Sequence, residues 1–309
     1  MAIWWENEME KINPAKTLGS VLVVASIGVT GSVDAGAFTS ESWTIDDSRL
    51  GLTNDPVGEQ QVDRLSGSYN ELLTLRGDGS FEATAWWNAA QFRLAGSGVP
   101  DNLAESPDPR SDSRYGLYGT LESTGQFDPG NGAFLGETGR ITLWLDPNLD
   151  TEFSFANWDP SSETGDAANG LDLSGTGEDI KIGSADVLKR GSGSFDPDAG
   201  EDDIGSFALL FGDWELTEDG QEYFVGPDPF WMDFRVSGQF DFIQSFIGGL
   251  DELDPEQSAT FEVTGSADGR FGQTTAIPEP GVLGLFGLGL LALGFVTRVR
   301  QQRSGAADA

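Results

Sequence analysis

The chain contains no cysteine and no histidine. These absences exclude Ser-His-Asp triads, Cys-His pairs and zinc sites with His or Cys ligands. Disulfides are excluded as well, so stability must come from core burial and, as a hypothesis, from bound cations. A carboxylate pair of the glycoside hydrolase kind needs only two acids about 5 to 10 Å apart and stays open as an alternative. Nothing singles out such a pair among 51 acidic residues, and we expect no enzyme.

Basic residues are also scarce, because 17 Lys and Arg stand against 51 Asp and Glu for a net charge of −34. Residues 38–280 alone hold 12 basic and 46 acidic residues, so this central part carries all of the excess. Such a surface repels nucleic acid and anionic lipid, and it favours solubility and cation binding. We therefore expect no nucleic-acid partner and expect divalent cations as partners.

The C-terminal end combines three features in a fixed order. An apolar run at 281–297 is 17 residues long and would cover about 25 Å as a helix, slightly less than a hydrocarbon core of about 30 Å. This predicts a single transmembrane helix. The positive-inside rule places residues 304–309 in the cytoplasm and the body outside. The motif before the run is Pro278, Glu279 and Pro280, and the basic stop after it is Arg298, Arg300 and Arg303.

This tripartite tail, over 276–303, resembles the PEP-CTERM sorting signal of Gram-negative bacteria that build exopolysaccharide. The resemblance implies that a membrane transpeptidase, an exosortase, recognises Pro278, Glu279 and Pro280. It further implies that the membrane holds the chain through its C-terminal helix only until processing. The released protein would then reside at the cell surface or in the extracellular matrix.

The N-terminal 37 residues have the layout of a secretory signal peptide. Lysines precede an apolar stretch at 18–29, which predicts a signal helix, and Ala35 and Ala37 supply a small-x-small cleavage site. Glu6, Glu8 and Glu10 precede the apolar stretch and do not suit a positive n-region, which suggests translation from Met9. The expected partners are the Sec machinery and signal peptidase.

Between the two ends lies one exported acidic domain, residues 38–275. Gly-x-Phe recurs along it, and a flexible turn residue followed by an aromatic suits the entry to a strand. Alternation of apolar residues, as in Phe81, Ala83, Ala85 and Trp87, supports strands. We predict an all-β fold, an antiparallel β-sandwich with long acidic loops at 96–113, 159–178 and 195–203.

Two acidic loops cluster the hard oxygen ligands that Ca²⁺ prefers. Asp146, Asn148 and Asp150 alternate as in a calcium loop, but Thr151 replaces the glycine of the sixth position. Each loop is a candidate calcium site, with a solvated acidic turn as the alternative; no cofactor is certain. The second loop contributes Asp196, Asp198, Asp202 and Asp203.

The nine tryptophans raise the question of sugar binding. In a strand, the pair Trp86-Trp87 puts one ring on each face, so at most one ring faces the main core. Trp86 and Trp231 are candidate platforms for stacking of sugar rings. The alternative, which we favour, is packing in the core or against a covering loop.

Several fragments over residues 65–246 are similar to the flocculation-associated PEP-CTERM proteins of the PepA type. They include Gly67-Ser-Tyr69, Trp87-Asn-Ala-Ala-Gln-Phe92 and Gly226-Pro-Asp-Pro-Phe230. This resemblance implies a matrix protein that promotes flocculation and biofilm cohesion with exopolysaccharide. The alternatives are a carbohydrate-binding, lectin-like module and a calcium-binding surface module.

Overall fold

The computed structural model describes residues 37–52, 56, 58–94, 101–102, 115–128, 130, 132–161, 165–195, 205–230, 232–243 and 257–275. Residues 36–277 form one compact unit. The predicted signal helix and the predicted transmembrane helix at 281–297 lie outside the described residues. Among the helices that the structure does describe, none has the length and hydrophobicity needed to span a membrane.

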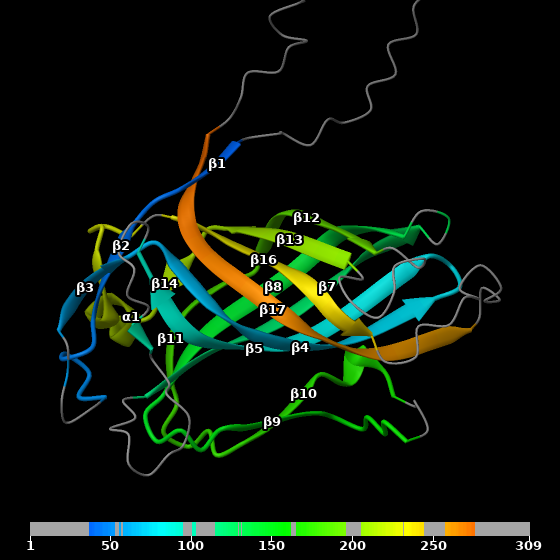
Figure 1. Ribbon diagram of the computed structural model, residues 1–309, viewed down its shortest axis with the longest axis horizontal. Helices are drawn as coiled ribbons and strands as arrows, with labels where there is room; N and C mark the ends of the chain where they lie inside the picture. The colour runs from blue at the N-terminus through cyan, green and yellow to red at the C-terminus, as the bar shows by residue number, and fades with distance from the viewer. Residues whose placement is uncertain are drawn as a thin grey trace, which may run out of the picture. The chain divides into compact units, whose positions relative to one another are not determined.

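The described chain is mostly β-structure, as the sequence predicts (Figure 1). Two short helices interrupt it, η1 (Ala167–Asn169) and α1 (Glu218–Tyr223). The strands are β1 (Ala37–Ser40), β2 (Trp43–Asp46), β3 (Glu59–Val62), β4 (Arg64–Arg76), β5 (Ser80–Arg93), β6 (Asp101–Asn102), β7 (Gly116–Asp128), β8 (Ala133–Asp146), β9 (Glu152–Phe155), β10 (Leu171–Ser174), β11 (Ile180–Ala185), β12 (Val187–Phe195), β13 (Gly205–Gly212), β14 (Glu215–Leu216), β15 (Phe224–Gly226), β16 (Asp233–Ile243) and β17 (Ser258–Thr275).

The architecture differs from the predicted sandwich, because the long strands belong to one sheet that closes on itself. The antiparallel order is β12-β13-β16-β17-β4-β5-β7-β8, and β8 pairs with β12 again. β11 and β14 continue from β8 as a branch, while β1 adds to β17. A closed sheet buries one face of every strand without a second sheet, so the alternation that predicts a sandwich fits this arrangement equally well.

Turn residues and bulges fix the register of the long hairpins. The β4–β5 turn places Gly79 at φ +85°, and the Asp78 carboxylate accepts a hydrogen bond from the Ser80 backbone N–H at 2.9 Å. A bulge near Gly67 breaks the β4–β5 register, and a Cβ atom on Gly67 would lie 1.7 Å from the Asn88 carbonyl oxygen. Bulges bend strands and increase their twist, which closure of a sheet requires.

The core fills the inside of the closed sheet. Phe81, Ala83, Ala85 and Trp87 on β5 are all buried, so the predicted alternation is confirmed. Aromatic rings gather around Phe271 on β17, which lies 4.5 Å from Phe234 between ring centroids. The other rings that contact Phe271 belong to Trp43, Trp214, Phe224 and Phe230.

The predicted loop at 159–178 is wrong in part, because it contains η1 and β10. β9 and β10 pair with each other, and together with η1 they form what we call the arm, residues 152–174. The arm packs against the outer face of β4 and β5 (Figure 1). Acidic and polar composition predicts a loop here, but the apolar residues Phe155, Ala167 and Leu171 supply a buried face.

Candidate functional site

The outer face of β4 and β5 carries a second apolar cluster beneath the arm. Leu72, Phe155 and Ala167 are buried in it, and Trp86 packs against it. The Trp86 ring stacks on Phe153 of β9, with ring centroids 4.7 Å apart and planes 14° apart. Trp86 therefore points away from the main core, as the alternation predicts, and one of its faces is covered by the arm. Its role as a sugar platform stays a prediction.

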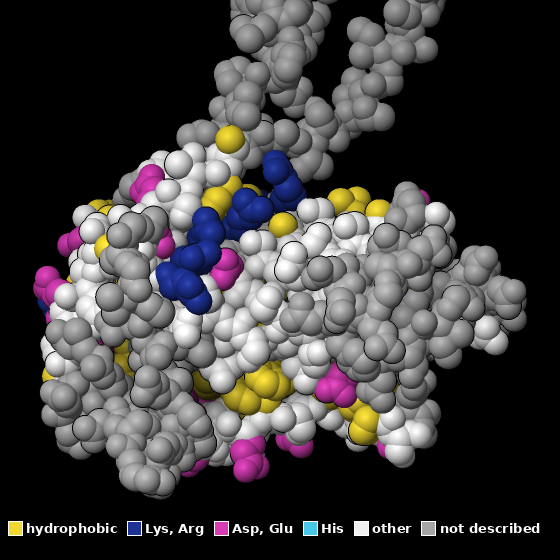
Figure 2. All heavy atoms as spheres, viewed as in Figure 1, with side chains coloured by type: hydrophobic (Ala, Val, Ile, Leu, Met, Phe, Trp, Pro, Cys, Tyr) yellow, Lys and Arg dark blue, Asp and Glu magenta, His cyan; other side chains and the backbone are white. Residues whose placement is uncertain are grey.

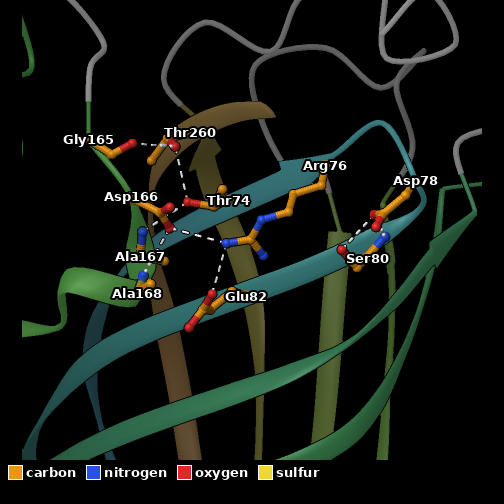
Figure 3. A network of polar contacts seen from close by, with 10 residues as sticks. All are labelled: Thr74, Arg76, Asp78, Ser80, Glu82, Gly165, Asp166, Ala167, Ala168 and Thr260. Carbon is orange, nitrogen blue, oxygen red and sulfur yellow. Dashed lines mark hydrogen bonds and ion pairs between the residues drawn. The ribbon is translucent and has the colours of Figure 1, made fainter. Parts of the chain in front are cut away.

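Two buried threonines fasten the arm to the sheet (Figure 3). The Thr74 hydroxyl accepts a hydrogen bond of 2.9 Å from the Ala167 N–H and lies 3.0 Å from the Thr260 hydroxyl. The Thr260 hydroxyl in turn lies 3.0 Å from the Gly165 carbonyl oxygen, to which it donates. Thr74 thus supplies an acceptor for the Ala167 N–H of η1, which burial would otherwise leave without a partner, and Thr260 contacts the backbone just before η1.

Arg76 forms the charged part of the same network (Figure 3). Its guanidinium lies 2.9 Å from Glu82 and 3.4 Å from Asp166. The hydrogen bond to Glu82 raises the pKa of Arg76, partial burial opposes this, and Asp166 adds to the increase. Asp166 also caps η1 by accepting from the Ala168 N–H at 3.0 Å. The network binds β4, β5 and η1 together, which is a structural role.

The turn after β8 contains the first candidate calcium site. Asp146 is buried, and its carboxylate accepts hydrogen bonds from the backbone N–H groups of Asn148, Leu149 and Thr151 at 3.1, 2.7 and 3.1 Å. These contacts hold the turn in place. The Asn148 amide donates a 2.6 Å hydrogen bond to Glu178, so the turn also contacts the segment that leads into β11.

Two further carboxyl groups lie beside this turn. A hydrogen bond between Asp150 and Glu178 raises the pKa of the exposed Asp150 carboxyl. Burial raises the pKa of Asp179, while the hydroxyls of Tyr118 and Thr151 donate to its carboxylate and oppose that rise. Within the described ranges, however, no group of three or more His, Cys, Asp or Glu side chains is arranged to hold a metal ion. Calcium binding at 146–150 stays a prediction.

The other predicted site residues have different placements. Ala37 is the first residue of β1 and is exposed. All the rest lie outside the described residues: Ala35, Asp196, Asp198, Asp202, Asp203, Trp231, Pro278, Glu279, Pro280, Arg298, Arg300 and Arg303. The structure therefore brings together only Asp146, Asn148 and Asp150 of the predicted ligands.

A carboxyl group inside the closed sheet was not expected from the sequence. Glu71 lines a cavity of about 60 Å³ to which all eight strands of the closed sheet contribute. The Tyr69 hydroxyl donates a 2.5 Å hydrogen bond to it. Burial raises the pKa of Glu71 to about 7, and the Tyr69 hydrogen bond opposes that rise. The period-two spacing of Tyr69, Glu71 and Leu73 carries the signal for this inward position.

Comparison with known proteins identifies the tail and nothing else in the chain. No curated protein and no solved structure matches the chain. The residues of the predicted sorting signal match a family model, and this match covers the Pro-Glu-Pro motif, the apolar run and two of the three terminal arginines. The match implies export, processing by an exosortase, and location at the cell surface or outside the cell. Residues 276–301 are a PEP-CTERM protein-sorting motif.

Proposed function

We propose that the exported β-domain is a matrix protein that promotes flocculation and biofilm cohesion together with exopolysaccharide. The sorting motif at 276–301 carries this proposal, because it sends the domain to the place where matrix polymers are found. The similarity to flocculation-associated PepA-type proteins agrees with it. The closed sheet gives the domain a compact body that can be exported as one unit.

The proposed mechanism is bridging of acidic polymers through divalent cations. All of the net charge of −34 resides in residues 38–280, so cations concentrate at this domain. Asp150 and Glu178 are neighbouring carboxyls at the surface, and two such groups repel unless a proton or a cation lies between them. Cation bridging therefore uses charge that the fold leaves exposed.

Deletion of the gene tests the cohesive role. The deletion strain should lose floc formation, and the wild-type gene should restore it. A complementing gene with Pro278→Ala, Glu279→Ala and Pro280→Ala is the matched control for export, because it leaves the β-domain unchanged. Normal flocs in the deletion strain would refute the proposal.

A carbohydrate-binding module is the second candidate, favoured by the partly exposed position of Trp86 on the outer face. Retention on an exopolysaccharide column that survives EDTA and that Trp86→Ala abolishes would favour this candidate over cation bridging. We also propose that the protein is not an enzyme. Shortening of the polysaccharide by the protein would overturn this. Loss of that activity in Asp150→Asn or Glu178→Gln would support a carboxylate-based glycoside hydrolase.

A further inference from the structure

Four arginines lie side by side across four neighbouring strands of the closed sheet. Arg235 of β16 is directly opposite Arg270 of β17, and Arg64 of β4 is directly opposite Arg93 of β5. β17 also pairs with β4, and Arg270 and Arg64 are each one residue beyond the last pair of those two strands. Because neighbouring strands are about 4.8 Å apart, this arginine row extends over about 15 Å.

The row is only partly neutralised. Asp268 lies 3.1 Å from Arg64 and 3.8 Å from Arg270. Arg93 and Arg235 are exposed, and neither forms an ion pair with any carboxylate in the part of the chain that the structure describes. The row thus has an excess of positive charge at its two ends.

This arrangement works against the stability of the fold. Like charges directly opposite each other on neighbouring strands are destabilising. The domain has 46 acidic and 12 basic residues, so acidic residues could easily lie between the basic ones. Four of the 12 basic residues nevertheless lie next to one another in one row. Figure 2 shows this band of Lys and Arg side chains, with an acidic side chain beside it. A cost that the sequence could easily avoid points to an anionic ligand.

A polar groove of about 900 Å³ adjoins the row on the same face. On β16, β17 and β4, the cross-strand positions next to the row are occupied by Ser237, Asp268 and Ser66. The Ser66 hydroxyl donates a 2.6 Å hydrogen bond to Asp268. The groove therefore offers hydroxyl and amide groups beside guanidinium groups. Its other polar side chains are Ser192, Ser194, Ser206, Gln239 and Ser266.

We propose that the arginine row and this groove bind a short segment of a carboxylated polysaccharide. The planar guanidinium fork matches a carboxylate, to which it donates two parallel hydrogen bonds. Serine hydroxyls and the Gln239 amide suit the hydroxyl groups of the sugar rings. The inference rests on the proposed function, because location in the matrix brings the protein into contact with such a polymer. It adds a direct contact that needs no divalent cation.

The charge of the remaining surface limits the length of the ligand. A net charge of −34 repels a long polyanion, so only the few sugars that lie in the groove are held. Nucleic acid is disfavoured, because it carries one charge per 1.7 Å of duplex and binds through many phosphate contacts.

Binding of polygalacturonate in the presence of EDTA tests the proposal, with protein purified as exported from producing cells. We expect binding at low salt and no binding of uncharged dextran. Binding should be lost at roughly 0.5 M NaCl, because salt at this concentration screens the attraction between exposed charges. The double variant Arg93→Gln/Arg235→Gln should bind polygalacturonate about tenfold more weakly. Arg93→Lys/Arg235→Lys keeps the charge but loses the planar fork of the guanidinium. Its affinity for polygalacturonate should lie between those of the wild type and the glutamine variant.

Arg140→Gln/Lys181→Gln is the matched control. It removes the same charge from exposed positions outside the groove and should bind as the wild type does. Melting curves check that each variant is folded. Equal binding by wild type and Arg93→Gln/Arg235→Gln, or an equal loss in the control, would overturn the proposal. Preference for dextran sulfate would overturn the carboxylate assignment, and preference for oligothymidylate would assign the row to nucleic acid.

The outcome is separable from that of the proposed function. Loss of flocs on deletion, with polygalacturonate binding unaffected by Arg93→Gln/Arg235→Gln, would refute the arginine row and keep the cohesive role. Normal flocs in the deletion strain, with weakened binding by the same variant, would refute the cohesive role and keep the ligand site.

Discussion

The Tyr69 hydroxyl donates a 2.5 Å hydrogen bond to the Glu71 carboxyl group inside the closed sheet, two residues further along β4. Burial raises the pKa of Glu71 from an ordinary value of 4.5 to about 7. Between these two pH values the folded protein keeps the proton and the unfolded chain releases it. The contribution of Glu71 to stability is therefore fully present below pH 4.5 and falls as pH rises to 7, by at most about 3 kcal/mol.

Glu71→Gln should remove this pH dependence, because the amide keeps the shape and the acceptor for Tyr69 but does not ionise. The free energy of unfolding of the wild type minus that of the variant, measured by urea denaturation from pH 4.5 to 8, should decrease across this range. Glu122→Gln, at an exposed ion pair with Arg140, is the control. A flat difference for Glu71→Gln would contradict the raised pKa.

Thr74→Val should cost about 1 to 3 kcal/mol, because it leaves the buried Ala167 N–H without its acceptor. Thermal or urea unfolding measures the loss. The exposed threonine pair on β7 and β8, with hydroxyls 2.7 Å apart, gives a matched control in Thr124→Val, which should stay within about 0.5 kcal/mol of the wild type. Equal effects at the two positions would show that Thr74 does not hold η1.

Phe153→Ala should loosen the arm. It removes the ring that stacks on Trp86 and meets Tyr118 edge-on at 5.0 Å, with an expected loss of about 2 kcal/mol. Faster proteolytic cleavage within 152–174 and a red shift of tryptophan emission are the readouts. Leu135→Ala removes a side chain that is 58% exposed and should leave both readouts unchanged.

Asp146→Asn should destabilise the turn after β8 by about 1 to 2 kcal/mol, because an amide has one acceptor oxygen where three N–H groups need partners. The loss should be present in EDTA, where a calcium ligand would contribute nothing. Calcium titration of wild type and Asp150→Asn tests the ion separately. No change in melting temperature at millimolar Ca²⁺ would reject the site at 146–150.

Gly67→Ala should reduce stability by roughly 1 to 3 kcal/mol, because the added methyl would collide with the Asn88 backbone at the bulge. Gly177→Ala is the control, since open space surrounds that position. Chemical denaturation compares them. A neutral Gly67→Ala would mean that β4 and β5 separate there at little cost.

Strand identity follows from local sequence, whereas closure of the sheet does not. Alternation along Phe81 to Trp87 predicts which side chains face inward. The pairing of β12 with β8 that closes the sheet joins Gly191 to Gly136, and no local pattern distinguishes it from a second sheet. Composition also hides the arm, because Asp, Gly and Ser surround the few apolar residues that dock it.

The candidate sites also differ in how far the sequence alone predicts them. The sorting motif is a contiguous string of residues and can be read directly from the sequence. The arginine row joins positions from 64 to 270, so it exists only once four strands are in register. Glu71 is visible as an inward position, but its raised pKa depends on burial by strands that are distant in sequence.

The path of β17 has a mechanical consequence. Thr275 is its last residue, and a pull on the chain beyond that point enters along an 18-residue strand paired with both β16 and β4. Load applied along paired strands is shared among many hydrogen bonds at once, whereas β1 meets β17 over only four positions and would peel first. A domain held by its tail under flow would thus transmit the load from β17 into β16 and β4, and β1 would add little resistance.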